Sequence, residues 1–171
     1  KRCWLFDSRG LVVKSRPELA HHKQHYAHEH APVATLLDAV KAVKPTVIIG
    51  VAAVGGAFTQ EVVGAMAAIN ARPIVFALSN PTSKSECTAE QAYAWSGGRA
   101  LFACGSPFDP VTMNGKHFVP RQGNNSYIFP GMGLGAILTG ATRITDPMFM
   151  AAARTLAGLV TDADLAQGSL Y

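Results

Sequence analysis

The sequence predicts an α/β domain built on a mostly parallel, doubly wound β-sheet of the Rossmann type. Segments that favour strands alternate with segments that favour helices over residues 34–104, and the joints between them are short. This order is typical of right-handed crossovers between parallel strands. Segment 46–51 is also β-branched and apolar on both faces, as expected of a strand that helices cover on each side.

The first predicted elements are a strand and a helix. Residues 2–7 are expected to form a short buried strand that ends in Asp7, and a turn at 8–10 follows. Apolar residues recur at helical spacing over 34–43, and Pro45 ends this helix. No glycine-rich phosphate loop precedes the first strand. We therefore expect the sheet to be incomplete on its N-terminal side.

The next two units continue the alternation. Strand 46–51 leads to a helix that begins after the N-cap Thr59 and ends at Ile69, where Asn70 is able to take a left-handed conformation. Segment 74–78 has the composition of the following buried strand.

A capping box predicts the third helix. Thr88 and Gln91 have the spacing of this motif, and Gly97 and Gly98 end the helix. Residues 100–103 then return to the sheet as another strand.

After the strand and helix units of residues 1–105, residues 106–171 differ in character. The pair Asn114-Gly115 predicts a β-hairpin. A polar loop then leads to predicted helices near 131–143 and 147–160. We expect these C-terminal helices to cover the sheet.

Composition narrows the classes of function. Hydrophobic residues make up 49% of the chain and charged residues only 15%, against a usual charged share of about 25%. Some apolar surface is therefore expected to meet other protein. No apolar stretch reaches the roughly 20 residues of a membrane helix. The basic residues behind the net charge of +4 are scattered, which favours an anionic small molecule over nucleic acid as the ligand.

Other motifs are absent or weak. The sequence has no nucleophile elbow, P-loop lysine motif or zinc-protease motif, so hydrolase and NTPase functions are not indicated. Three unpaired cysteines predict reduced thiols. Five histidines between His21 and His30 lack suitable acidic partners, and we interpret them as a polar surface segment rather than a metal site. The glycines at 131, 133 and 135 follow no strand, which favours close helix packing over phosphate binding.

The candidate cofactor residues lie where predicted strands end. Asp7 ends the first strand, where an acid in this fold contacts the adenine ribose; an ordinary turn residue is the alternative. Ser8, Arg9, Lys14 and Lys23 could receive a 2′-phosphate, which would favour NADP over NAD; a solvated basic face is the alternative. The small residues of 51–56 allow the backbone to approach a ring or a ribose, and the candidates in this segment are Val51, Ala52, Ala53 and Gly55.

Three asparagines are candidates for binding the substrate. Asn80 follows strand 74–78, and its amide can donate to a carboxylate without adding charge; an ordinary turn is the alternative. Asn124 and Asn125 precede a helix start, where backbone N–H groups also favour anions.

Several motifs, taken together in their order, resemble one enzyme family. They are the segments 76–82 (Phe-Ala-Leu-Ser-Asn-Pro-Thr), 86–90 (Glu-Cys-Thr-Ala-Glu), 105–110 (Gly-Ser-Pro-Phe-Asp-Pro) and 123–131 (Gly-Asn-Asn-Ser-Tyr-Ile-Phe-Pro-Gly). The chain resembles the malic enzymes in these segments and in near-continuous register from Asp7 onward. Arg121 and Cys104 depart from the residues usual in that family.

This resemblance implies oxidative decarboxylation of malate to pyruvate and CO2, with Mg2+ or Mn2+ as the metal and a nicotinamide cofactor. It implies that Asn80 and Asn125, with Asn124 beside it, contact substrate, that the 51–56 turn and Asn80 line the cofactor, and that Asp7 and Ser8 lie at its adenosine end. NADP is favoured because Ser8 and Lys23 match NADP-preferring members, although NAD stays possible.

The resemblance also implies what residues 1–171 lack. They would form a partial NAD(P)-binding domain of a longer chain, with the catalytic residues and the metal ligands upstream, so that this segment alone is expected to be inactive. A homo-oligomer in the cytoplasm or an organelle, chloroplast or mitochondrion, is expected. Another Rossmann-type dehydrogenase and a non-catalytic nucleotide-binding module are the alternative functions.

Overall fold

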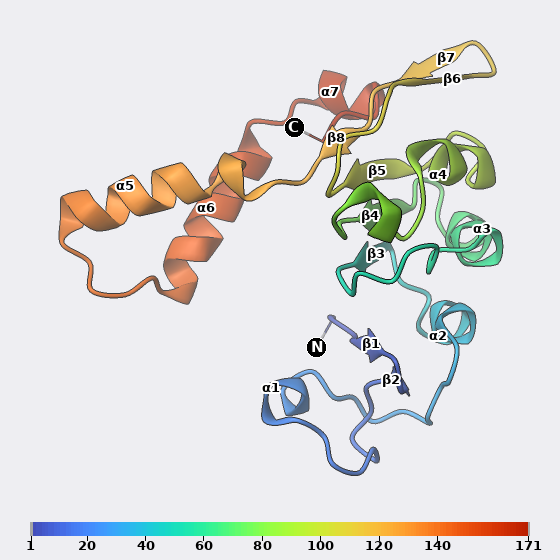
Figure 1. Cartoon of the computed structure of the whole chain (residues 1–171), viewed down its shortest axis with the longest axis horizontal. Coiled ribbons are helices and arrows are strands. Elements are labelled where there is room, and N and C mark those ends of the chain that lie inside the picture. Colours follow the sequence, from blue (N-terminus) through green and yellow to red (C-terminus); the bar gives the residue numbers. More distant parts are fainter. Residues whose placement is uncertain (1, 171) are drawn as a thin grey trace.

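The structure, a computed structural model, describes residues 2–170. Its centre is a four-stranded sheet in the order β3-β4-β5-β8, in which every neighbouring pair is parallel (Figure 1). The strands are β3 (Val47–Gly50), β4 (Ile74–Ala77), β5 (Leu101–Cys104) and β8 (Arg121–Gln122). The predicted α/β class with a parallel sheet is confirmed.

Three helices lie in a row along one face of this sheet (Figure 1). They are α2 (Leu36–Val43), α3 (Gln60–Ile69) and α4 (Ala89–Trp95). Each begins at a threonine whose hydroxyl accepts a backbone N–H of the first turn, and the capping box of α4 is present as predicted. Asn70 differs from the prediction because its backbone is extended. Its side-chain amide instead donates to the carbonyl of Met66 and so satisfies the end of α3.

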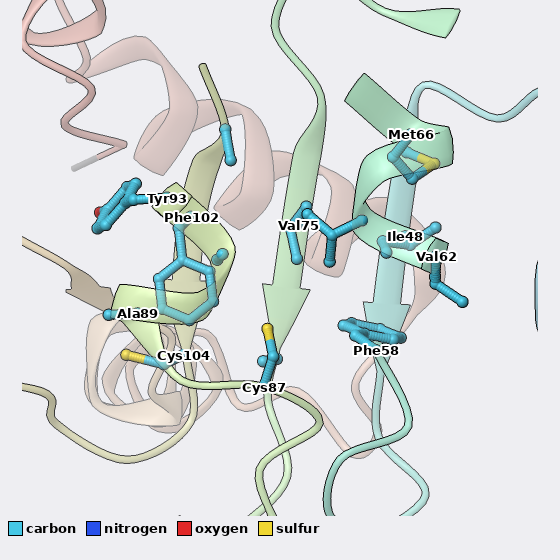
Figure 2. Packing of buried hydrophobic residues seen from close by; sticks show 14 of the residues in the cluster. Ile48, Phe58, Val62, Met66, Val75, Cys87, Ala89, Tyr93, Phe102 and Cys104 are labelled. Atoms are coloured by element: carbon cyan, nitrogen blue, oxygen red, sulfur yellow. The ribbon is translucent and has the colours of Figure 1, made fainter. Parts of the chain in front are cut away.

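The main core fills the space between this helix layer and the sheet. In Figure 2 the strand side chains Ile48, Val75 and Phe102 point toward side chains of the helices, among them Val62 and Met66. Val75 and Met66 have no exposed surface, and Phe102 is 1% exposed. Burying each such side chain contributes about 1.5–3 kcal/mol, so this layer holds the strands in place.

Within residues 2–170 the opposite face of the sheet is open at β3, whereas all four residues of β5 are buried. Ile49 of β3 points away from the core and is 57% exposed. The prediction that helices cover strand 46–51 on both sides is therefore wrong for the described part of the chain. The apolar residues of this strand predicted burial on both faces, but an apolar sequence does not specify which segment of protein covers each face.

The N-terminal segment forms a separate unit. β1 (Phe6–Asp7) pairs antiparallel with β2 (Gly10–Leu11), and α1 (His21–Gln24) follows. The prediction of a buried strand over 2–7 is wrong, because β1 is half-buried and does not join the parallel sheet. The chain reverses at Gly10, where a β-carbon would lie 2.3 Å from the carbonyl oxygen of Val33. Leu11 packs against α2 and attaches the unit to the helix layer.

The hairpin after β5 is confirmed. β6 (Val111–Met113) pairs antiparallel with β7 (Lys116–Phe118). Asn114 and Gly115 both have positive φ, 52° and 75°, as a tight two-residue hairpin turn requires. The ring of Phe118 stacks on Tyr93 of α4, which fixes the hairpin against the helix layer.

The last helices form an arm that leaves the sheet (Figure 1). α5 (Phe129–Thr139) and α6 (Asp146–Gly158) bury no side chain, and Ile137 is 79% exposed. The prediction that they cover the sheet is therefore wrong in this structure. Their apolar content predicted burial, but it could not specify the surface that buries them. The predicted close packing at the glycines of α5 is also wrong, since a β-carbon at 131, 133 or 135 would meet no atom within 4 Å.

Short elements complete the fold. A 3-10 turn, η1 (Thr82–Lys84), follows β4, and another, η2 (Asn125–Tyr127), precedes α5. α7 (Asp162–Ala166) returns the chain toward β8. Arg121 of β8 donates to the hydroxyl of Ser169, 2.9 Å away. None of the helices within residues 2–170 is long and apolar enough to cross a membrane.

Candidate functional site

The carboxyl ends of the four parallel strands bring four loops to one edge of the sheet. The loops begin at Val51 after β3, Ser79 after β4, Gly105 after β5 and Gly123 after β8. Ligands of open α/β sheets bind outside this edge. The sequence candidates in 51–55, at Asn80 and at 124–125 therefore belong to the same edge.

Asn80 presents a fixed amide at this edge. The hydroxyl of Ser106 donates to Oδ1 of Asn80 across 2.7 Å, which orients the amide and leaves the Nδ2 hydrogens for other partners. Nδ2 lies 3.5 Å from the carbonyl of Leu78, too far for a strong bond. Gly105 allows this approach, since a β-carbon there would lie 2.1 Å from the carbonyl oxygen of Leu78. Asn80 is thus an exposed hydrogen-bond donor.

The turn that follows β3, residues 51–56, is exposed but held from below. Ala53 has a φ of +54°, unusual for a residue with a β-carbon, and its N–H donates to the hydroxyl of Ser79 across 2.9 Å. The N–H of Gly56 donates to the carbonyl of Ser85. Gly55 lies so close to the neighbouring loop that a β-carbon would be 2.7 Å from the carbonyl oxygen of Ser83. The turn therefore offers a fixed surface of small residues.

A buried carboxylate lies beneath both loops. Glu86 is 2% exposed, and its carboxylate accepts hydrogen bonds from the hydroxyl and the N–H of Ser79. Its side chain fills the space beside Gly50, where a β-carbon would lie 2.3 Å from Cδ. Sequence reasoning missed this residue, because an acid in the polar segment 83–86 carries no local sign of burial.

The second group of candidates surrounds Asp7. Arg16 donates to both of its carboxylate oxygens across 2.8 Å, and Nζ of Lys23 lies 2.5 Å from Oδ2. Burial raises the pKa of Asp7, but hydrogen bonds from Lys23, the Arg9 backbone and Arg16 outweigh this effect and lower the pKa to about 2. Ser8 lies exposed in the adjoining turn.

Arg16 was not anticipated as part of this group. Its side chain is 8% exposed and also donates to the carbonyls of Gly10 and Leu11. Nothing in the local sequence separates it from Lys14, a neighbouring cation that instead pairs with Glu29 at the surface. Only the fold of the hairpin brings Arg16 back to Asp7.

The two asparagines before α5 differ in their contacts. Oδ1 of Asn124 accepts the N–H of Ser126 across 2.9 Å and caps η2. The exposed amide of Asn125 makes no side-chain hydrogen bond to the described part of the chain. Of the two, Asn125 has the greater capacity to bind an added ligand.

The candidates therefore fall into separate groups in this structure. Ala53 and Asn80 are joined through Ser79, and Asp7 is joined to Lys23. No hydrogen bond or ion pair among residues 2–170 links the Asp7 group to the strand-end loops. The same residues contain no group of three or more His, Cys, Asp or Glu that could hold a metal ion.

Comparisons with known proteins agree on one family. The model described as "Malic enzyme, NAD binding domain" matches residues 1–171. The chain is 58% identical to the chloroplastic NADP-dependent malic enzyme of Oryza sativa subsp. japonica and to NADP-dependent malic enzyme 3 of Arabidopsis thaliana. It is 56% identical to the NADP-dependent malic enzyme of Columba livia. Each alignment covers all of this chain but only 27%, 29% and 31% of the respective relative.

Proposed function

The chain belongs to the malic enzyme family, and on this premise we propose that the protein to which it contributes converts malate and NADP to pyruvate, CO2 and NADPH. The observation that carries the proposal is the exposed amide of Asn80, oriented by Ser106 at the carboxyl edge of the parallel sheet beside the 51–56 turn. This arrangement suits a small carboxylate next to a flat ring.

The strand-end residues would bind and orient the two reactants. Nδ2 of Asn80 would donate to a carboxylate of malate, and the free amide of Asn125 would provide a second donor. The small residues of the 51–56 turn would lie against the nicotinamide half of the cofactor. The cofactor, when bound, supplies a hydride acceptor for C2 of malate. Holding both reactants in one geometry is a large part of what a protein adds to such a reaction.

The Asp7 group supports NADP over NAD as the proposed cofactor. The single carboxylate of Asp7 pairs with two cations, Arg16 and Lys23, so the group keeps a net positive charge. A cationic site beside the strand-end acid is suited to a 2′-phosphate. Asp7 would then orient these cations as well as face the ribose.

No step through the metal is assigned to residues 2–170, because the described side chains provide no cluster for Mg2+ or Mn2+. We propose that the metal ligands come from elsewhere in the full-length protein. Assembly as a homo-oligomer, in the cytoplasm or in an organelle, remains part of the proposal. One of the relatives is named as chloroplastic.

The test is malate-dependent NADPH formation by the full-length protein with Mn2+. We expect activity in the wild type and a loss of about 100-fold in kcat/KM for malate in Asn80→Ala, the order expected for removing an oriented polar contact. Gln60→Ala removes another exposed amide, at the start of α3, and should retain activity. A purified wild type that forms no NADPH under these conditions would reject the proposal. Residues 1–171 produced alone are expected to be inactive.

A further inference from the structure

Glu86 is the only buried carboxylate in the part of the chain that the structure describes. None of the ion pairs within residues 2–170 involves it, and its hydrogen bonds come from the hydroxyl and the N–H of Ser79. A carboxylate in such a place is costly unless its acceptors are used. The contacts of Ser79 indicate what this arrangement achieves.

The Ser79 hydroxyl has a single hydrogen, and that hydrogen is donated to Glu86. Its lone pairs are therefore directed to the other side, where the N–H of Ala53 donates across 2.9 Å. The carboxylate oxygens of Glu86 accept from the N–H and the hydroxyl of Ser79, so Glu86 sets the direction of the Ser79 hydroxyl and, through it, of the hydrogen bond from Ala53. The result is a one-way chain from Ala53 through Ser79 to Glu86.

This chain of hydrogen bonds begins at Ala53, the strained point of the 51–56 turn. Ala53 has a φ of +54°, a conformation that costs energy for a residue with a β-carbon, and its N–H is held at Ser79. On the other side, Ser79 is followed directly by Asn80, whose amide is held by Ser106. The same short segment thus fixes the cofactor turn and the substrate amide relative to each other.

We infer that Glu86 is a positioning residue, which through Ser79 holds the 51–56 turn in the conformation that binds the nicotinamide cofactor. The inference rests on the proposed function for the identity of the ligand. It predicts that cofactor affinity depends on the hydrogen-bond chain and on the left-handed conformation of Ala53, and not simply on how well the core is packed.

The test measures NADPH binding to the full-length protein by fluorescence titration. Ser79→Ala is expected to weaken NADPH binding about tenfold, the effect of losing an anchoring hydrogen bond. Glu86→Gln keeps one acceptor but adds a donor facing the Ser79 N–H, so its affinity should fall between the wild type and Ser79→Ala. Ser79→Thr retains the hydroxyl and should bind nearly as the wild type does.

Ser96→Ala is the matched control for packing and stability. Ser96 is also buried, donates its hydroxyl hydrogen to a carbonyl and accepts the N–H of Ala100, but it lies before β5 at the opposite edge of the sheet. Ser96→Ala should lower Tm without changing NADPH affinity.

A rescue variant tests the role of the left-handed conformation. Adding Ala53→Gly to Ser79→Ala should recover several-fold of the lost affinity, since glycine adopts positive φ freely.

The outcomes separate the inference from the proposed function. Wild-type protein that binds NADPH but forms none from malate would reject the proposed reaction alone. Unchanged affinity in Ser79→Ala, or weakening equal to that of Ser96→Ala, would overturn the positioning role. Wild-type affinity in Glu86→Gln beside a weakened Ser79→Ala would overturn the part assigned to Glu86.

Discussion

Nζ of Lys23 lies 2.5 Å from Oδ2 of Asp7, so the two residues that the sequence assigned to the ribose and to its 2′-phosphate form an ion pair. Arg16 holds the same carboxylate through both of its oxygens. Lys23 uses one of its three N–H donors on Asp7, so it has two further donors that it can offer to a phosphate.

The first prediction concerns the choice between NADP and NAD. Lys23→Gln in the full-length enzyme should raise KM for NADP by about tenfold or more, because a charge-assisted hydrogen bond is lost, and should leave KM for NAD nearly unchanged. Steady-state kinetics with each cofactor measures this. Lys14→Gln is the control, since Lys14 pairs with Glu29. Equal increases for both cofactors would place Lys23 outside the phosphate site.

The second prediction concerns stability and pH. The pKa of Asp7 is lowered from 3.8 to about 2 in the folded protein. Its stabilising effect is therefore present above pH 3.8 and is lost as the pH falls through 2. At pH 7 the effect is about 2 kcal/mol at most, and roughly half of it should remain at pH 3.

Urea unfolding of the wild type and of Asp7→Asn at pH 7 and at pH 3 would measure this effect. The difference in the free energy of unfolding between the two proteins should shrink at the lower pH. Asp38→Asn, at the exposed start of α2, is a control for loss of a surface carboxylate. A difference that stays constant between the two pH values would show that the ion pairs of Asp7 do not contribute as described.

The third prediction concerns thiol reactivity. Burial, with smaller effects from Glu86 and Cys104, raises the pKa of Cys87 to about 12, and burial raises the pKa of Cys104 to about 11. Neither forms much thiolate at pH 8, so iodoacetamide should leave both unmodified in the native protein and alkylate both in denaturant. Peptide mapping by mass spectrometry distinguishes the sites. Rapid native labelling of either cysteine would contradict its burial.

The fourth prediction concerns the arm of α5 and α6. Leu134, Ile137 and Leu138 of α5 are 58%, 79% and 76% exposed, and exposed apolar surface of this kind promotes association. Residues 1–171 produced alone should self-associate, and Leu134→Gln with Ile137→Gln should reduce the associated fraction seen by light scattering. Arg154→Gln on α6 removes a charge but no apolar surface and should not. Monomeric wild-type polypeptide would refute the prediction.

Local chemistry accounts for how much of the fold could be predicted. A threonine that caps a helix, or an Asn114-Gly115 pair that requires positive φ, acts over a few residues, so each of these signals was visible in the sequence. The same holds for the motifs around Asn80 and Asn125, which carry the family resemblance. The prediction of a left-handed conformation at Asn70 was wrong, because the side-chain amide of Asn70 donates to the carbonyl of Met66 and satisfies the end of α3 with an extended backbone.

The sequence by itself determined the alternation of strands and helices over residues 34–104, the Asn114-Gly115 hairpin, the family and the candidate residues, because these depend on local preferences and on motifs along the chain. The tertiary structure alone decided that the arm leaves the sheet, that Arg16 returns to Asp7, and that Glu86 lies under Ser79. Each of these outcomes depends on which parts of the chain meet in the folded protein and on how deeply they are buried. No single segment of sequence contains that information.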